Sequence, residues 1–294
     1  YMADVLDRFL FENRSIRGEI VSLEKSFQAI LVAADYPEFV QSLIGELMVT
    51  ASLLTATLKF EGEIALQIRS EGPVKYIIVN GTHDQKLRGV ARWDEKITEA
   101  PKTFSECFKK GILAITLTPK DGRRYQGMVA LDKPSLSACV EDYFLQSEQL
   151  LTKVFLTSRV GENPKAAGLL IQIVPTTSKS SNVQENPDFE HVAHLANTVS
   201  SEEILTLEHT EMIHRLYHDE VIRIFEPQEV EFSCDCSRQR SAGALKSVDK
   251  KELLAIIAED GNIKMDCQFC RNVYVYDEID VHNIHGQNME SSRA

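Results

Sequence analysis

Four of the six cysteines in this 294-residue chain lie in two tight pairs within its last quarter. Cys234 and Cys236 form a C-x-C pair, and after thirty further residues Cys267 and Cys270 form a C-x-x-C pair. Zinc in proteins takes four soft or borderline ligands in a tetrahedron, usually as two close pairs joined by a longer loop. The spacing therefore predicts that these four thiolates bind one structural Zn²⁺ ion.

The segment that joins the two pairs carries its own secondary structure. SVDKKELLAIIAEDGNIKM (247–265) predicts one helix that ends near Gly261, followed by a strand. A module of about 60 residues is small for an unaided hydrophobic core. We therefore expect zinc binding to supply much of the stability of a C-terminal domain at residues 232–294.

The one-residue gap between Cys234 and Cys236 brings their sulfurs closer together than a C-x-x-C turn does, so that they can also oxidise to one another. Thiolates held on zinc stay deprotonated at neutral pH and remain nucleophilic toward peroxide. Oxidation to a disulfide removes the lone pairs that hold the metal. Losing zinc would remove folding free energy on the order of 10 kcal/mol. The site is therefore either an oxidation-triggered unfolding switch or an inert zinc ribbon, which is by itself far commoner.

The rest of the sequence indicates a reducing compartment for these thiols. No stretch approaches the roughly 18 to 20 apolar residues that a membrane-spanning helix needs. The first residues lack the basic and apolar regions of a secretory signal. We therefore expect a cytoplasmic protein with no membrane partner, where structural disulfides are rare and paired cysteines more often bind metal.

The formal net charge of −12 is concentrated in one part of the chain. Residues 1–178 carry 21 Lys and Arg against 22 Asp and Glu, residues 179–231 carry 3 against 12, and residues 232–294 carry 8 against 10. A surface that binds nucleic-acid phosphates needs clustered positive charge. None of the three segments offers it, so we expect no nucleic-acid partner.

Residues 1–178 show both hydrophobic periods. The predicted strands are 64–70, 74–80, 112–119, 124–131 and 167–175. Helices are predicted at 37–60 and at 135–150, where Leu136, Cys139, Val140 and Tyr143 share one face. Because helices and strands do not alternate regularly, we predict an α+β fold with a mixed α/β sheet for this N-terminal domain.

A polar, proline-punctuated stretch at 175–190 predicts a boundary, and residues 179–231 read as an acidic helical linker. Asn186 can cap a first amphipathic helix, and Ser200 with Glu203 can form the capping box of a second, which carries Leu205 to Tyr217. Like charges one helical turn apart each cost a few tenths of a kcal/mol. We expect this segment to fold only against a neighbour, and marginally.

Other reactive side chains favour structural roles. Cys107 and Cys139 are predicted to be buried thiols with no flanking base, which leaves nucleophilic catalysis unsupported. Five of the eight histidines lie at 191–218, including His214 and His218 one helical turn apart, but the glutamate of a zinc-protease motif is missing between them. His282 and His285 are surplus as zinc ligands beside four thiolates. No phosphate-binding loop is present, and we expect no enzymatic activity.

Stretches along the whole chain resemble a known family. The cysteine blocks EFSCDCSRQR and AEDGNIKMDCQFC are similar to those of the bacterial redox-regulated heat-shock holdase chaperones, heat shock protein thirty-three. The other stretches that carry the resemblance are LLTATLKFEGEI (53–64), RYQGMVAL (124–131), CVEDYFLQSEQL (139–150) and RLYHDEVIRIFEPQEVEF (215–232).

The resemblance implies a mechanism. Reduced protein would hold zinc through Cys234, Cys236, Cys267 and Cys270 and be inactive as a chaperone. Peroxide or hypochlorite, aided by heat, would join Cys234 to Cys236 and Cys267 to Cys270 and release zinc. The C-terminal module and the metastable linker would unfold, and the exposed apolar surface would hold unfolding client proteins without ATP. The resemblance also implies that the active form is a homodimer.

Two other functional classes stay open on the residues alone. A thiol-disulfide oxidoreductase would use Cys267-x-x-Cys270, but the pair lacks a thioredoxin-type strand and helix around it. A zinc-ribbon nucleic-acid binder is opposed by the acidic charge. For a chaperone, the candidate client surfaces are the apolar linker faces at 192–217 and the N-terminal sheet.

Overall fold

In this computed structural model the chain forms two compact units, Tyr1–Ser233 and Cys234–Ala294. The structure describes residues 4–58, 61–174 and 186–286. The predicted boundary between the N-terminal domain and the linker, after residue 178, lies outside the described residues, as does most of the polar stretch 175–190.

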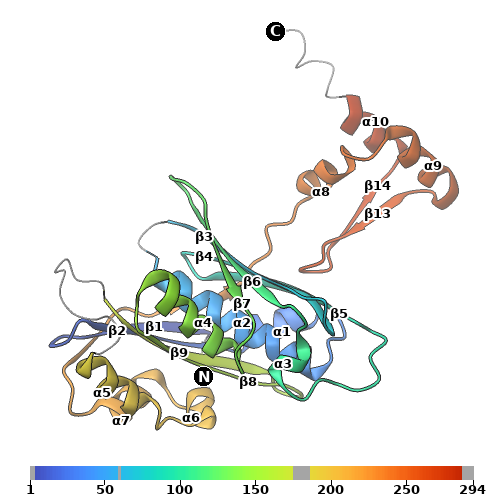
Figure 1. Cartoon of the computed structure of the whole chain (residues 1–294). Helices are drawn as coiled ribbons and strands as arrows, with labels where there is room; N and C mark the ends of the chain where they lie inside the picture. The colour runs from blue at the N-terminus through green and yellow to red at the C-terminus, as the bar shows by residue number, and fades with distance from the viewer. Residues whose placement is uncertain (1–3, 59–60, 175–185, 287–294) are drawn as a thin grey trace. The chain divides into compact units, whose positions relative to one another are not determined.

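The first unit contains two six-stranded sheets, here named sheet A and sheet B (Figure 1). Sheet A has the strand order β10-β1-β2-β9-β8, and β11 also pairs with β1. Every pairing in sheet A is antiparallel. Its strands are β1 (Val5–Phe11), β2 (Ile16–Leu23), β8 (Thr152–Arg159), β9 (Lys165–Ile173), β10 (Ile222–Ile224) and β11 (Gln228–Glu229).

Sheet B has the strand order β12-β5-β4-β3-β6-β7. Its pairings are antiparallel except the one between β12 and β5, which is parallel. Its strands are β3 (Gly62–Arg69), β4 (Val74–Thr82), β5 (Lys86–Trp93), β6 (Ile112–Pro119), β7 (Tyr125–Ala130) and β12 (Glu231–Phe232).

Helix α2 (Glu38–Ala56) lies between the two sheets and forms the centre of the main core. Its apolar residues pack with side chains of sheet A such as Val21 and of sheet B such as Ile64. By length and composition α2 could cross a membrane, so the expectation that no stretch approaches that length is wrong. In the structure 72% of the apolar window of α2 is buried, because both sheets cover it.

The predicted helix at 135–150 is an α-helix followed by a π-helical turn. The α-helical part is α4 (Leu136–Tyr143), which the Ser135 side chain caps by accepting from the Ala138 N–H, and the turn is η1 (Phe144–Glu148). The face predicted to be apolar, which includes Cys139 and Val140, is buried in the main core. The remaining helices of this layer are α1 (Lys25–Leu31) and the short α3 (Phe104–Cys107).

Strand periodicity located five strands of the first unit. The predicted strands correspond to β3, β4, β6, β7 and β9, with ends within a few residues. Ile64, Leu66 and Ile68 are fully buried while the residues between them are not, as the alternation predicts. The N-terminal strands β1 and β2 and the strands β5 and β8 were not predicted. The α+β class is confirmed.

The other face of sheet A is covered by the segment that the sequence assigns to the linker. This segment forms α5 (Pro187–Ala196), α6 (Ser201–Thr206) and α7 (His209–Tyr217). Buried residues of the three helices form a second core with side chains of β1, β2 and β9. The sheet residues of this core are Phe9, Phe11, Ile16, Ile20, Ala167, Leu169 and Ile171. The linker segment therefore folds against a neighbour, as expected.

The predicted helix caps in this segment are confirmed, but one predicted helix is wrong. Asn186 accepts from the Phe189 N–H, and Ser200 and Glu203 form a reciprocal capping box. The single helix predicted beyond Ser200 is divided, because Leu207 and Glu208 are both extended. The break changes the direction of the chain, and buried residues of both α6 and α7 reach the same core on sheet A.

The second unit is small. It contains α8 (Arg238–Leu245), α9 (Lys250–Asp260), a hairpin of β13 (Ile263–Asp266) and β14 (Val273–Tyr276), and α10 (Glu278–Gly286). The predicted helix and strand between the cysteine pairs are α9 and β13, and α9 ends at Gly261 in the left-handed conformation. Helix α8 also lies between the pairs and was not predicted, so the expectation of a single helix there is wrong. The described core of this unit contains six buried residues, so it has little apolar burial of its own.

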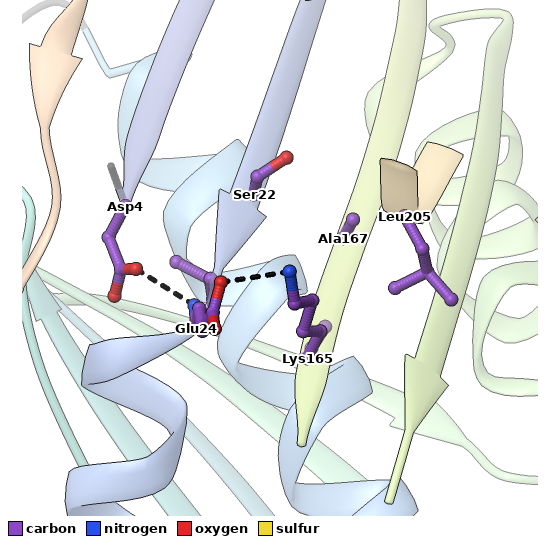
Figure 2. A pocket seen from close by; sticks show the side chains of 8 residues that line it. Asp4, Ser22, Glu24, Lys165, Ala167 and Leu205 are labelled. Atoms are coloured by element: carbon purple, nitrogen blue, oxygen red, sulfur yellow. Dashed lines mark hydrogen bonds and ion pairs between the residues drawn. The ribbon is translucent and has the colours of Figure 1, made fainter. Parts of the chain in front are cut away.

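One small cavity lies where α6 meets the last residues of β2 and the first residues of β9 (Figure 2). Leu205 of α6 and Ala167 of β9 line it, and the Lys165 ammonium lies 2.9 Å from the Glu24 carboxylate. Its volume of about 10 Å³ leaves room for little more than a water molecule. Asp4 beside it accepts from the N–H groups of the first turn of α1. We assign this cavity a packing role only.

Candidate metal centre

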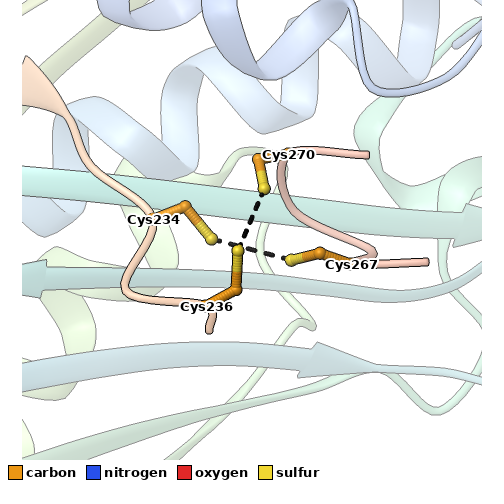
Figure 3. A group of neighbouring side chains, drawn as sticks. All are labelled: Cys234, Cys236, Cys267 and Cys270. Atoms are coloured by element: carbon orange, nitrogen blue, oxygen red, sulfur yellow. Dashed lines mark hydrogen bonds between the residues drawn. The ribbon is translucent and has the colours of Figure 1, made fainter. Parts of the chain in front are cut away.

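The four paired cysteines come together in the second unit (Figure 3). Their sulfur atoms all lie within 4.8 Å of one another. The Cys234 and Cys267 sulfurs are 3.6 Å apart, and the Cys236 and Cys270 sulfurs are 3.3 Å apart. Among the described residues, this is the one group of three or more potential metal-binding side chains that lie close together. The arrangement can hold a metal ion.

Two local structures present the sulfurs. The C-x-C pair precedes α8, which Ser237 caps by accepting from the Arg240 N–H. The C-x-x-C pair lies in the turn of the β13–β14 hairpin, where the Cys267 N–H donates to the Asn272 carbonyl over 2.8 Å. Arg271 adopts the left-handed conformation with a φ of 62°, which closes this turn. Cys267 and Cys270 thus lie between two strands of one hairpin, whereas a thioredoxin-type pair lies between a strand and a helix.

Tyr274 is a neighbour of the site that the sequence analysis missed. Its hydroxyl donates to the Cys236 sulfur over 3.1 Å. This hydrogen bond lowers the pKa of the Cys236 thiol to about 7, whereas burial raises the pKa of Cys234 to about 11. Burial also raises the pKa of Cys270, to about 12. Cys236 is thus the thiol that ionises most easily among these three.

Arg238 ties the first cysteine pair to the rest of the unit. Its guanidinium donates to the Asp280 carboxylate and to the Val275 carbonyl, each over 2.6 Å, and lies 4.6 Å from the centre of the Tyr276 ring. The Tyr276 hydroxyl donates back to the Arg238 carbonyl over 2.8 Å. Because Arg238 follows Cys236 by two residues, these contacts join the metal-binding loop to β14 and α10.

The remaining cysteines and histidines are not part of this cluster. Cys107 and Cys139 are 4% and 1% exposed, which confirms that they are buried thiols, and burial raises the pKa of both. The His214 and His218 rings lie 6.5 Å apart between centroids. Within the described residues neither joins a third potential ligand. His282 lies 3.7 Å from the Glu278 carboxylate.

His209 of α7 makes buried polar contacts with sheet A. It is 3% exposed, and one ring nitrogen lies 2.7 Å from the Asp7 carboxylate on β1. The other ring nitrogen lies 2.7 Å from the Ser22 hydroxyl on β2. The sequence showed only a histidine among four others in the linker. Its partners are about 200 residues away along the chain, so no local pattern identifies it.

Ion pairs also join the acidic linker segment to the rest of the first unit. Arg14, in the β1–β2 turn, lies 3.0 Å from the Glu220 carboxylate and also pairs with Asp188. Arg159 on β8 lies 2.5 Å from Glu202 on α6. These cations offset part of the repulsion within a segment that carries three basic and twelve acidic residues. Most of these groups are exposed, so each pair contributes little by itself.

Replacing His209 with alanine is expected to loosen the linker segment without unfolding the first unit. The change leaves Asp7 and Ser22 without their buried partner, which costs about 1–3 kcal/mol. Amide hydrogen exchange in α5–α7 should become about tenfold faster or more, while exchange in α2 stays unchanged. His218→Ala is the control, because the His218 side chain is 61% exposed. Equal exchange in the two variants would contradict a role of His209 in docking.

Three comparisons with known proteins find similarity to the same group of proteins. A family model described as Hsp33 protein matches residues 4–277. The chain is 55% identical over 283 residues to the 33 kDa chaperonin of Pseudoalteromonas atlantica, covering 96% of this chain and 95% of that protein. It is 47% identical over 289 residues to the 33 kDa chaperonin of Shewanella oneidensis, covering 98% of each.

A solved structure is similar over nearly the whole chain. The crystal structure of the 33 kDa chaperonin from Thermotoga maritima matches with a TM-score of 0.82, covering 98% of this chain and 99% of that chain. The two sequences are 20% identical, so this likeness shows the fold alone.

Proposed function

The chain belongs to the Hsp33 protein family, and from this premise we propose that it acts as a redox-regulated, ATP-independent holdase. The membership predicted from the sequence is confirmed, and the protein is a chaperone of that family. The reduced form would bind zinc and be inactive, and oxidation would expose apolar surface for unfolding proteins. The observation that best supports this proposal is the gathering of four thiols that are metal ligands and oxidation targets at once.

Zinc is the metal that we propose for the four-cysteine site, with Cys234, Cys236, Cys267 and Cys270 as ligands. Four thiolates are a donor set that zinc prefers, and Zn–S bonds of about 2.3 Å imply sulfur separations of about 3.8 Å. The observed sulfur contacts of 3.3 Å and 3.6 Å need only small adjustments to reach that value. When bound, the cation would supply the positive charge that keeps all four sulfurs as thiolates.

Oxidation would proceed on the chain's own sulfurs. A thiolate attacks a peroxide oxygen, the O–O bond breaks, and a sulfenic acid forms while one hydroxide leaves. A second thiolate then attacks the sulfenic sulfur, which forms the disulfide and releases another hydroxide. Each disulfide uses one peroxide and two thiolates, so two peroxides oxidise the four sulfurs and leave the metal without ligands.

The proposed disulfides are Cys234–Cys236 and Cys267–Cys270, as the family resemblance implies. The shortest sulfur contacts in the structure instead join members of different pairs, Cys234 with Cys267 and Cys236 with Cys270. All the separations are within 4.8 Å, so proximity alone does not select the pairing. Peptide mapping of the oxidised protein decides between them.

The release of the linker is the proposed link between oxidation and client binding. We keep the division into an N-terminal domain (1–178), a linker (179–231) and a C-terminal redox domain (232–294) as part of the proposal. In the structure the linker helices belong to the first compact unit and cover an apolar face of sheet A. If they leave, the residues of β1, β2 and β9 in the second core become exposed, together with the apolar faces of α5–α7.

One experiment tests the proposed function as a whole. Reduced, zinc-loaded protein is treated with peroxide at mild heat, and zinc release, helix content and the aggregation of a heat-denatured client such as citrate synthase are followed together. We expect zinc release, loss of helix and suppression of aggregation, with none of these in untreated protein. Zinc release without suppression would contradict the holdase proposal. Turnover of a disulfide substrate would instead favour an oxidoreductase.

The Tyr274 hydroxyl is expected to slow the oxidation of the zinc-bound site. It donates a hydrogen bond to the Cys236 sulfur, which lowers the electron density on that sulfur and makes it a weaker nucleophile toward peroxide. Tyr274→Phe should therefore release zinc about threefold faster or more at a fixed peroxide concentration, measured with a zinc-binding dye. Tyr276→Phe is the matched control, since that hydroxyl is on the same hairpin but donates to the Arg238 carbonyl of α8 and not to a cysteine sulfur. Equal acceleration in both variants would show general destabilisation instead.

Unfolding client proteins are the proposed partners, and the oxidised form is proposed to be a homodimer in the cytoplasm. We propose no enzymatic activity, no membrane partner and no nucleic-acid partner. Sedimentation of the reduced and oxidised forms tests the proposed change in oligomeric state.

A further inference from the structure

The outer face of sheet B differs from the other sheet faces of the first unit. The inner faces of both sheets pack on α2, and α5–α7 cover the remaining face of sheet A. The helices that contact sheet B most, α1, α2 and α4, lie on its inner face, where the main core is. Along the outward positions of β3–β7 the side chains are exposed or half-buried, except Val90 and Thr116.

One row of outward residues across this face is basic. The strand register places Arg92, Tyr76, Arg69, Ile112 and Ala130 side by side on five neighbouring strands. Two arginines thus flank a tyrosine, and an exposed isoleucine follows. Over the residues of β3–β7 the sequence has five Lys and Arg but a single acidic residue, Glu63. This excess of positive charge belongs to a chain whose formal net charge is −12.

The next row across the face is apolar. It consists of Val90, Ile78, Gln67, Ala114 and Met128 in register. The solvent face of an antiparallel sheet is normally polar. Here one residue of the five is polar, and the Met128 side chain is 59% exposed. A role in solvation alone does not account for this row.

A hollow of about 460 Å³ joins the two rows at the β3–β6–β7 end of the sheet. Its floor is Ala114 with Ile112 and Met128, and Gln67 and Gln126 lie among them. Arg69, Ser70, Glu71 and Lys110 line the rest of it, and the Lys110 ammonium lies 3.1 Å from the Glu71 carboxylate and offsets its charge beside Arg69. The hollow therefore offers apolar contact beside a guanidinium, which binds carboxylates in a two-pronged geometry.

We propose that this outer face binds an extended apolar segment of an unfolding client that is flanked by Asp or Glu. The apolar side chains would occupy the hollow against Met128 and Ile112, and the carboxylates would pair with Arg69 and Arg92. The inference rests on the proposed holdase function and adds to it a surface and a preference among clients. Charge complementarity is the basis for the preference, because like-charged segments are repelled from the same face.

The test measures binding of a labelled peptide to the full-length chain after oxidation and zinc release. The probe is a fluorescein-labelled peptide with an apolar core and glutamates at both ends, and its twin has lysines in their place. We expect the glutamate peptide to bind about tenfold more tightly than the lysine peptide in fluorescence anisotropy. Added salt should reduce this difference.

Exposed positions allow variants that are expected to fold. Arg69→Gln combined with Arg92→Gln should weaken binding of the glutamate peptide about three- to tenfold. Met128→Gln should weaken binding of both peptides about threefold. The matched controls are Arg123→Gln, which removes an exposed charge on the β6–β7 turn, and Val32→Gln, where the residue is 82% exposed on another part of the unit. Thermal melts establish that all variants are folded.

The outcomes separate this inference from the proposed function. If a protein that carries all three substitutions, at residues 69, 92 and 128, binds the glutamate peptide as tightly as the parent chain does, the inference is overturned. Tighter binding of polyuridine RNA than of the glutamate peptide, lost on removing the two arginines, also overturns it, since the face would then bind nucleic acid. Suppression of client aggregation by the oxidised parent chain is measured in parallel. Its absence contradicts the holdase function, whereas its presence with unchanged peptide binding contradicts only this surface.

Discussion

Replacing Cys267 with serine is expected to abolish metal binding and to unfold the second unit. The Cys267 sulfur lies in the four-thiol cluster, and a hydroxyl is a poor substitute for a thiolate on zinc. Binding of a structural zinc ion contributes on the order of 10 kcal/mol to folding. The described core of the second unit has six buried residues and cannot replace that contribution. Zinc content by elemental analysis and exchange of the α8–α10 amides measure the result.

On the proposed zinc site, the same loss is expected when a strong chelator removes the metal from the unsubstituted protein. The first unit should remain folded, because its main core lies around α2 and does not depend on the cysteine pairs. Cys107→Ser is the matched control, since this buried thiol is outside the cluster. A Cys267→Ser protein that retains one zinc per chain, or retains slow exchange in α8–α10, would show that the site is not needed for folding.

Replacing Met212 with glutamate is expected to activate the reduced, zinc-loaded protein. Met212 is 1% exposed and lies in the second core between α7 and sheet A. Burying an unpaired carboxylate there costs several kcal/mol, so the linker helices should leave the sheet. On the proposed mechanism the apolar face of sheet A is then available without oxidation. Aggregation of a heat-denatured client should be suppressed in the absence of peroxide, with zinc still bound.

Thr210→Glu is the matched control for this prediction. It adds the same charge one turn or less away on α7, but at an exposed position. It should leave the reduced protein inactive and exchange in α5–α7 unchanged. If Met212→Glu releases α5–α7 by exchange and the reduced protein still fails to suppress aggregation, the linker helices do not cover the client-binding surface. The holdase mechanism would then need a different covered surface.

Features set by neighbouring residues could be predicted from the sequence. Ser200 and Glu203 are three residues apart, and their capping box forms as predicted. Ile64, Leu66 and Ile68 alternate along one strand, and all three are buried. The prediction of a single helix beyond Ser200 was wrong. The reason is tertiary: the chain extends at Leu207 and Glu208, and both α6 and α7 bury residues against the same sheet.

Features that depend on long-range register could not be predicted. No spacing relates Tyr274 to Cys236, although the hairpin places the hydroxyl 3.1 Å from the sulfur. Counting charges along the chain showed no basic cluster, because Arg69 and Arg92 come from strands separated by β4. They share a row only once the sheet is assembled.

By itself the sequence determined the α+β class, the helix caps and the two cysteine pairs, because spacing of a few residues controls each of them. Only the tertiary structure decided which surfaces are covered. It brought His209 to Asp7 and Ser22 across about 200 residues, placed the acidic helices on sheet A, and left the residues of the basic and apolar rows of sheet B, except Val90, exposed or half-buried. These contacts join segments far apart in the chain, and their geometry follows from packing rather than from local preference.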